Sequence, residues 1–286
     1  MAESLPYTSP VQKWTGWIAH AGSRFSARLG RNSALVNQLR PGYERLLGIA
    51  ALGKGISWPV NGEPLHIDPR MRRLVAREVE PELMEFLRQN IRPRNVVVDI
   101  GSFLGVYATL AARWSSPGGR VLAFEPTPAM VPFLRSHLQM NDVADRVQLF
   151  ECALGAESGS ATLHLHSDPY RNSLGGQDPD GQASGTATVP IVTLDQICHE
   201  QGVAPDLIRM DVQGFEQAVL AGARETIARG RGRLKIVLEV HPQLWSQMGI
   251  TPQSFDALLA ELGVRAVPLG HEPLYTPDAH VTLEYL

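Results

Sequence analysis

Apolar and polar positions along residues 95–240 alternate between strand-like and helix-like spacing. Short apolar runs predict strands at 95–100, 120–124, 147–151, 206–211 and 234–240. Between them, apolar positions at helical spacing predict helices over 104–114, 128–140 and 215–228. Strands that alternate with helices are typical of a parallel sheet covered by helices on both faces. We therefore expect an α/β fold with a mainly parallel, doubly wound sheet.

The alternation is interrupted after the third predicted strand. Ala161, Leu163 and Leu165 alternate with polar neighbours, which is the period of a strand, and a second strand is expected around Val189–Val192. Residues 167–187 between them are rich in Gly, Ser, Asp and Pro, and long loops of this kind often carry function. The pattern predicts a β-rich insertion over residues 159–194.

Residues 1–77 are predicted to form a helical N-terminal extension that ends in a short hairpin. Basic amphipathic stretches within residues 1–55 predict helices, and Asn61-Gly62 predicts the hairpin between Trp58 and Ile67. A basic amphipathic helix can lie on a membrane surface. We favour an arm that packs on the main domain or on a second subunit, so these helices are candidates for a homo-oligomer contact. A helix over 78–90 then opens the main domain, residues 78–286.

Composition excludes several classes of protein. A formal net charge of −3 over 286 residues gives no general electrostatic reason to bind nucleic acid. The chain has no apolar run long enough for a membrane span. Its two cysteines, Cys152 and Cys198, have neither metal-type spacing nor a disulfide pattern. We therefore expect a cytoplasmic protein.

The loop after the first strand of the predicted sheet carries the candidate chemistry. Gly101 permits a tight turn, Gly105 permits close approach of the backbone, and the helix that follows offers free N–H groups. The spacing Asp-x-Gly-x-x-x-Gly differs from the Gly-x-Gly-x-x-Gly of dinucleotide-binding folds. Asp99 would repel a diphosphate and attract an amino group or a sulfonium. The loop therefore favours S-adenosylmethionine over NAD.

Two further acids follow strands of the same predicted sheet. Glu125 lies 26 residues after Asp99, at the end of the second strand, where a carboxylate can accept both hydroxyls of a ribose. Glu151 follows the third strand and could accept the adenine amino group, with the Cys152 backbone beside the ring. An ordinary surface acid is the other interpretation of Glu151, and the sequence does not decide between them.

The fourth and fifth strands bring three more candidates to the carboxyl edge of the sheet. Asp211 could act as a base, anchor a substrate hydroxyl or bind a metal. Glu239 and His241 reach the same edge, and a histidine can accept a hydroxyl proton near neutral pH. Together these three could bind a divalent cation. Because no tight ligand spacing supports it, a metal is not the interpretation we favour.

These segments together resemble the FkbM-type methyltransferases over roughly residues 60–270. The resemblance rests on the order and spacing of Val98-Asp99-Ile100-Gly101 with Gly105, Phe124-Glu125-Pro126, Ala153-Leu154-Gly155, Asn172-Ser173-Leu174, Thr193-Leu194-Asp195, Asp211-Val212-Gln213-Gly214, Val219-Leu220-Ala221-Gly222-Ala223 and Glu239-Val240-His241-Pro242. Two positions depart from the family pattern. Ser102-Phe103 replaces Ala-Asn, although Ser102 could partly replace the amide contact to the cofactor. Gln213 replaces a Glu and cannot act as an acid or base.

The resemblance implies a Rossmann-like class I fold and S-adenosylmethionine as cofactor. It also implies methylation of a hydroxyl on a sugar, polyketide or other small natural product. His241, Asp211 and Glu239 are then the catalytic candidates, and Asp211 also lies close enough to contact the cofactor. Asn172 and Ser173 of the insertion would contact the acceptor, together with His241. Two alternatives stay open: a non-catalytic S-adenosylmethionine-binding protein, and a carboxyl O-methyltransferase.

Overall fold

The computed structural model describes residues 38, 42, 43, 48, 53–174 and 183–286. The chain divides into two compact units, one of residues 1–79 with 136–142 and one of residues 80–135 with 143–286. The helices predicted within residues 1–55 fall almost wholly outside the described residues. The division between residues 77 and 78 and the oligomer contact therefore stay predictions.

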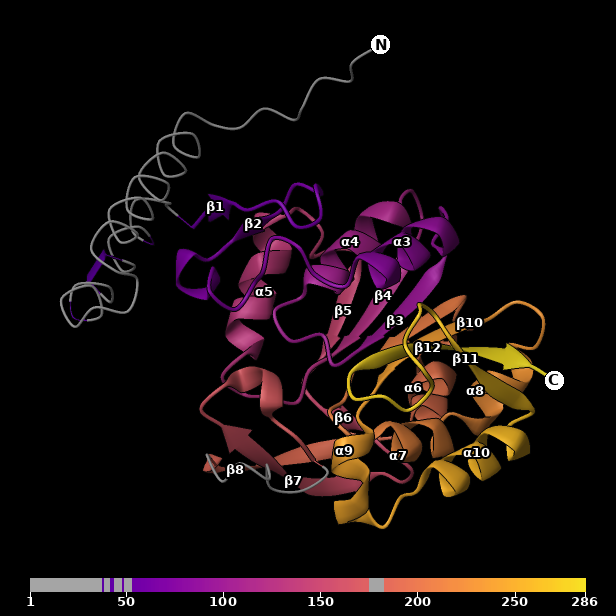
Figure 1. Ribbon diagram of the computed structural model, residues 1–286. Coiled ribbons are helices and arrows are strands. Elements are labelled where there is room, and N and C mark those ends of the chain that lie inside the picture. The colour runs from indigo at the N-terminus through magenta and orange to yellow at the C-terminus, as the bar shows by residue number, and fades with distance from the viewer. Residues whose placement is uncertain (1–37, 39–41, 44–47, 49–52, 175–182) are drawn as a thin grey trace. The chain divides into compact units, whose positions relative to one another are not determined.

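The larger unit is built on a seven-stranded sheet with the strand order β11-β12-β10-β9-β3-β4-β5 (Figure 1). Its strands are β3 (Val96–Ile100), β4 (Arg120–Phe124), β5 (Val147–Phe150), β9 (Leu207–Met210), β10 (Lys235–Val240), β11 (Val264–Pro268) and β12 (Ala279–Tyr285). Five neighbouring strands are parallel: β10, β9, β3, β4 and β5. The strand β12 runs antiparallel to both of its neighbours. The predicted α/β class and all five predicted strands are confirmed.

Helices cover both faces of this sheet (Figure 1). On one face lie α3 (Pro81–Asn90) and α4 (Val106–Trp114), and on the other lie α6 (Leu194–Gln201), α8 (Arg224–Arg229) and α10 (Pro252–Glu261). The central strands are buried on both sides because nearly every residue is apolar, and all four residues of β9 are buried. The helix α5 (Val131–Met140) begins in the larger unit, and its residues from 136 onward belong to the smaller one.

One predicted helix is wrong in its extent. The expected helix over 215–228 is two helices, α7 (Glu216–Ala221) and α8, separated at Gly222-Ala223. The backbone of Gly222 lies so close to Gly155 that a Cβ would stand 2.0 Å from the Gly155 carbonyl oxygen. The Asp195 carboxylate then accepts the N–H groups of Glu225 and Thr226, which starts α8 afresh.

The predicted β-rich insertion is confirmed as a separate three-stranded sheet. It has the order β6 (Ala153–Leu154), β8 (Ala183–Val192), β7 (Gly159–His166). The loop between β7 and β8 is shorter than expected, since β8 begins at residue 183 and a 3-10 helix, η2 (Pro169–Arg171), follows β7. The expected alternation also fails at its end: the register shifts between Leu165 and His166, and His166 is buried.

The smaller unit contains the predicted hairpin. Its strands β1 (Ile56–Ser57) and β2 (His66–Ile67) pair antiparallel, and Asn61 and Gly62 turn the chain with φ values of 48° and 81°. A 3-10 helix, η1 (Pro69–Met71), follows. Among the described residues, no helix has the length and apolar character needed to cross a membrane.

Candidate functional site

The site lies where β3 and β9 are neighbours in the sheet. From this pair the chain order runs outward in both directions, to β4 on one side and to β10 on the other. Ligands of open α/β sheets bind outside the carboxyl ends of the strands at such a point. The Asp211 N–H after β9 donates to the carbonyl of Ile100 at 2.9 Å, which joins the two strand ends. Asp99, Asp211, Glu239 and His241 are all brought to this edge.

Gly101 is required by the turn after β3. Its φ is +79°, and a Cβ there would lie 1.8 Å from the carbonyl oxygen of Asp211. Gly105, with φ 77°, is the N-cap of α4. The Ser102 hydroxyl donates to the carbonyl of Asp99 at 2.9 Å and so braces the turn. The predicted tight turn at Gly101 is confirmed, the close approach predicted at Gly105 stays a prediction, and the Ser102 side chain bonds to the backbone.

Glu125 holds the turn from the second strand. Its side chain is buried, Oε2 accepts the Phe103 N–H at 2.7 Å, and Oε1 accepts the Thr127 N–H at 2.7 Å. Burial raises the pKa of this carboxyl. Each oxygen retains capacity for a further hydrogen bond, so the carboxylate can still receive ribose hydroxyls.

Asp99 has a carboxylate oxygen without a partner. Its side chain is 2% exposed, and Oδ1 lies 3.4 Å from Nη1 of Arg209. Oδ2 has no hydrogen-bond partner among the described residues. Burial raises the pKa of Asp99 in spite of the guanidinium. A buried acceptor of this kind suits a ligand that brings its own donor, such as the ammonium group of S-adenosylmethionine.

The residues after β5 differ in character. Glu151 is exposed and forms an ion pair with Arg135 on the surface. Cys152 is buried, and burial raises the pKa of its thiol to about 11. Nothing aims the Glu151 side chain at the edge of the sheet, and its contact with adenine stays a prediction.

His241 is held by a buried carboxylate that the sequence analysis did not single out. Glu216, in the first turn of α7, has no exposed surface and accepts N–H groups of Gly214 at 2.9 Å and of the Trp245 indole at 2.8 Å. Its Oε1 lies 2.8 Å from Nδ1 of His241, which is 1% exposed. Because a carboxylate only accepts, Nδ1 carries the proton, and Nε2 is left to face the edge of the sheet.

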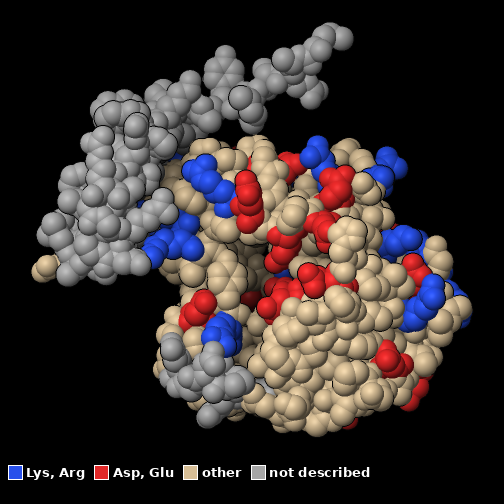
Figure 2. Space-filling view, viewed as in Figure 1, with Lys and Arg blue, Asp and Glu red and all other residues tan. Residues whose placement is uncertain are grey.

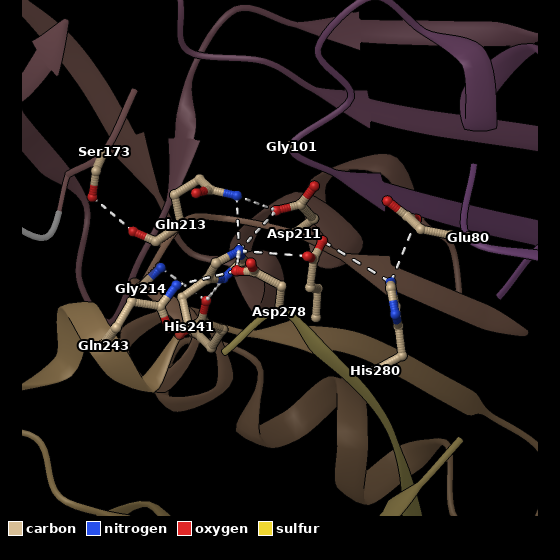
Figure 3. A network of polar contacts seen from close by, with 12 residues as sticks. Glu80, Gly101, Ser173, Asp211, Gln213, Gly214, His241, Gln243, Asp278 and His280 are labelled. Atoms are coloured by element: carbon tan, nitrogen blue, oxygen red, sulfur yellow. Dashed lines mark hydrogen bonds and ion pairs between the residues drawn. The ribbon is translucent and has the colours of Figure 1, made fainter. Parts of the chain in front are cut away.

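Three carboxyl groups lie within 4 Å of Nε2 of His241. This nitrogen is 3.8 Å from Asp211 Oδ1 and 3.7 Å from Asp278 Oδ1 (Figure 3), and 3.8 Å from Glu239 Oε1. Burial alone would lower the pKa of His241, but Glu216 and the other carboxylates outweigh it and raise that pKa to about 9. Burial and the charge of Asp211 raise the pKa of Glu239 to about 9. Several carboxyl groups therefore surround one imidazole, and the raised pKa of Glu239 favours its neutral form.

Arg209 is the cation that balances part of this charge. It lies within β9, its Nη2 is 3.0 Å from Asp211, and its guanidinium stacks over the Tyr107 ring at 4.4 Å. A charged residue in the otherwise apolar run Leu207–Met210 was a signal for a paired internal charge. The strand over 206–211 was predicted, but Arg209 was not singled out.

Glu80 and His280 extend the site on its other side. Glu80, the N-cap of α3, has a left-handed φ of 36° and accepts the Tyr107 hydroxyl at 2.5 Å. His280 Nε2 lies 3.4 Å from Glu80 and 4.0 Å from Glu239. His280, Arg209 and Tyr107 lower the pKa of Glu80 to about 2 against the opposing effect of burial. Acidic side chains accordingly gather near the middle of the face shown in Figure 2.

Two sets of side chains have the atoms to share a cation. Oxygen or nitrogen atoms of Asp211, Glu239 and His241 lie within 4.8 Å of one another, and so do those of Glu80, Glu239 and His280. However, the amide nitrogen of Gln213 lies 3.0 Å from Asp211 Oδ1 and 2.8 Å from His241 Nε2. An amide donor therefore already bridges two of these atoms, and we keep the prediction that a metal is not favoured.

The insertion reaches the site through Ser173. The Ser173 hydroxyl donates to the carbonyl of Gln213 at 2.7 Å, and the ring of Tyr170 packs 4.5 Å from that of Phe103. Asn172 instead accepts the His166 N–H at 2.8 Å and braces its own turn. Of the two residues predicted to contact the acceptor, only Ser173 lies against a site loop.

Comparison with known proteins gives the family. The model of the family described as "Methyltransferase FkbM domain" matches residues 99–266, which is more than half of the chain. The chain belongs to the FkbM methyltransferase family. Membership confirms the resemblance read from the sequence, and it places the chain among the S-adenosylmethionine-dependent methyltransferases.

Individual relatives cover the chain in part. Methyltransferase sdnD of Sordaria araneosa is 26% identical over 202 residues, which are 61% of this chain and 75% of the relative. The 2-O-methyltransferase NoeI of Sinorhizobium fredii (strain NBRC 101917 / NGR234) is 31% identical over 154 residues, 49% of this chain and 62% of the relative. The crystal structure of Methyltransferase FkbM from Methylobacillus flagellatus KT is 17% identical, with a TM-score of 0.46. It covers 70% of this chain and 50% of that one.

Proposed function

We propose that this FkbM-family methyltransferase transfers a methyl group from S-adenosylmethionine to a hydroxyl oxygen of a small molecule, such as a sugar or polyketide. The observation that carries the proposal is the Glu216–His241 pair. It fixes Nδ1 as a donor to a buried carboxylate, at 2.8 Å, and leaves Nε2 facing the ligand edge of the sheet. A histidine held in this way can take the proton of an alcohol. The relative named a 2-O-methyltransferase supports transfer to oxygen.

The residues around the β3 turn fit the cofactor. Glu125 would accept the ribose hydroxyls, Asp99 would accept the ammonium group, and the backbone of Gly101 would lie against the ligand. Oδ2 of Asp99 has no hydrogen-bond partner among the described residues and could accept a hydrogen bond from the ammonium group. When bound, the cofactor supplies an electrophilic methyl group on a sulfonium. Phe103, which departs from the Asn of the family pattern, contributes its backbone N–H to Glu125.

The chain's own part in the reaction is orientation and proton removal. His241 Nε2 would accept the hydroxyl proton as the oxygen attacks the methyl group, and Glu216 would stabilise the imidazolium that forms. Asp211 and Glu239 would accept hydrogen bonds from neighbouring hydroxyls of the acceptor. Correct positioning of the two reactants provides a large part of the rate enhancement in such a displacement.

The charges of the site argue against a carboxylate as the acceptor. The carboxylates of Asp211 and Asp278 lie within 4 Å of His241 Nε2, while Arg209 is already engaged by Asp99 and Asp211. An anionic acceptor would meet like charge, which raises its free energy of binding. Neutral or cationic hydroxyl compounds meet no such repulsion. We therefore place carboxyl O-methylation second.

Cofactor binding tests the first half of the proposal. We expect Asp99→Ala and Glu125→Ala to abolish binding of S-adenosylhomocysteine measured by calorimetry. Asp145→Ala is the matched control, because Asp145 is exposed and pairs with Arg146 at the surface. Retained micromolar affinity in both site variants would refute the cofactor assignment.

Transfer of labelled methyl groups tests the second half. The purified chain is incubated with labelled S-adenosylmethionine and a panel of polyhydroxylated and carboxylic acceptors. We expect label in alcohols, and a loss of about 100-fold or more in kcat for His241→Ala with cofactor affinity unchanged. Cofactor binding without turnover on any acceptor would favour the non-catalytic alternative.

A further inference from the structure

Gln213 occupies the space in front of the proposed base. It follows Asp211 by two residues, in the loop between β9 and α7, and its φ of 50° is left-handed. This backbone aims the side chain back toward the edge of the sheet, where its amide lies between Asp211 and His241 (Figure 3). The proposed function gives this residue no role.

The orientation of the Gln213 amide follows from its two partners. Its nitrogen lies 3.0 Å from Asp211 Oδ1, and a carboxylate can only accept a hydrogen bond. The same nitrogen lies 2.8 Å from His241 Nε2. With NH2 fixed toward Asp211, its second hydrogen points at Nε2, and this hydrogen bond forms only when Nε2 is unprotonated. A proton on Nε2 would place two donors against each other.

The position of Gln213 is braced from both ends. Its carbonyl accepts the Ser173 hydroxyl at 2.7 Å, and the next residue, Gly214, donates its N–H to Glu216 at 2.9 Å. The carboxylate that holds Nδ1 of His241 therefore also holds the loop that carries Gln213. Glu216 contacts Nδ1 of the imidazole directly, and through the Gly214 N–H it also holds the loop whose Gln213 contacts Nε2.

The carboxyl groups around His241 favour the protonated ring, whereas the contact with Gln213 favours the neutral one. Glu216 on α7, Asp211 after β9, Glu239 on β10 and Asp278 before β12 all lie within 4 Å of a ring nitrogen and favour the protonated ring. Arg209 on β9 bears positive charge, and Glu80 and His280 lie beyond Glu239. Among the described contacts of Nε2, only Gln213 offers it a neutral hydrogen-bond donor.

We propose that Gln213 is a positioning residue that favours the neutral form of His241 by donating to Nε2, the contact that the acceptor hydroxyl takes over when it binds. The amide and an alcohol O–H are equivalent donors to that nitrogen. An incoming hydroxyl displaces the amide, which stays hydrogen-bonded to Asp211. This inference rests on the proposed function of His241, and it explains what a Gln does at a position where the family pattern has Glu.

The isosteric change Gln213→Glu tests the inference. A carboxylate cannot donate to Nε2 and instead accepts from a protonated one, so the pKa of His241 should rise, by about 1 to 3. The measurement is a ¹⁵N NMR titration of the imidazoles in the full chain, with the His241 signals assigned from their absence in a His241→Asn sample. This readout needs neither an acceptor nor turnover.

The kinetic counterpart separates this role from a structural one. At pH 7.5, kcat of Gln213→Glu should fall about tenfold or more and recover as the pH is raised, with the KM for the cofactor unchanged. Gln196→Glu, an equal charge change at an exposed position of α6, is the matched control and should alter neither value. Gln213→Ala, which removes the donor without adding charge, should give a smaller rise in the His241 pKa than Gln213→Glu.

Two results would overturn the inference. One is a His241 pKa that is the same in wild type, Gln213→Ala and Gln213→Glu. The other is a loss of kcat in Gln213→Glu that is equal at every pH. If instead the titration shifts as expected while no hydroxyl compound is methylated, the donation from Gln213 to Nε2 stands, whereas the proposed function and the exchange with an acceptor hydroxyl fail.

Discussion

At the scale of single residues, the site depends on polar groups that are buried and almost fully partnered. Glu216 shows the principle, since three N–H groups converge on one carboxylate that has no exposed surface. Burying a charge is costly unless such donors surround it. The carboxylate therefore fixes the imidazole of His241 and the Gly214 loop together.

Glu216→Gln should damage both activity and stability. The amide replaces one acceptor with a donor, which must face an N–H of Gly214, Trp245 or His241. We expect kcat to fall about 100-fold or more, and the free energy of unfolding to fall by about 1.5–3 kcal/mol. Steady-state kinetics and urea denaturation measure these effects. Glu225→Gln, whose side chain is 67% exposed and pairs with Arg229, is the control and should change stability by less than about 1 kcal/mol.

The raised pKa of His241 predicts how activity and stability depend on pH. A base must be unprotonated, so kcat/KM should rise with pH until about 9, the pKa of His241 in the folded chain. Stability follows the opposite course. The folded pKa lies above 6.5, so the stabilisation from His241 is complete below that pH and is lost as the pH rises through about 9. Urea denaturation of the wild type and of His241→Asn between pH 6 and pH 10 checks this. If the assignment is wrong, the free energy of unfolding of the wild type falls no more than that of the variant as the pH rises.

At the scale of elements, the sequence predicted those parts whose residues follow one clear period. The five strands and the helix faces against them have such a period, and so does most of β7. The break between α7 and α8 could not be predicted, because it depends on contact between Gly222 and Gly155, far apart in the chain. Glu216 was missed because an acid in the first turn of a helix is also what an ordinary exposed helix start contains. The edge strand β11 and its neighbour β12 were not placed.

The contact between the insertion and the Gln213 loop predicts that Ser173 affects the site. Its hydroxyl donates the hydrogen bond that joins the insertion to the Gln213 carbonyl, at 2.7 Å. Ser173→Ala should lower kcat several-fold through a looser Gln213 loop, and should cost about 1 kcal/mol of stability. Ser160→Ala, at an exposed position of β7, is the control. Equal kcat for the two variants would show that the insertion does not support the site.

At the scale of the whole chain, residues 53–79 are joined to the later sequence by specific polar contacts. The Asp68 N–H donates to His137 Nε2 at 2.9 Å, and the His66 N–H donates to Asn141 Oδ1 at 2.9 Å. Asn141 in turn donates to the carbonyl of His66 at 2.7 Å. His137 and Asn141 are both buried. The end of α5 therefore depends on the hairpin segment.

This dependence predicts that a chain of residues 80–286 is less stable than one of residues 53–286. The shorter chain loses the partners of two buried side chains, and each unsatisfied group costs about 1–3 kcal/mol. We expect its thermal midpoint to fall by several degrees or more. Both chains lack residues 1–52, so the comparison isolates residues 53–79. His137→Ala in the longer chain should reproduce part of the loss. Equal thermal midpoints for the two chains would mean that residues 80–286 alone make a complete folding unit, as the sequence boundary at residue 78 implies.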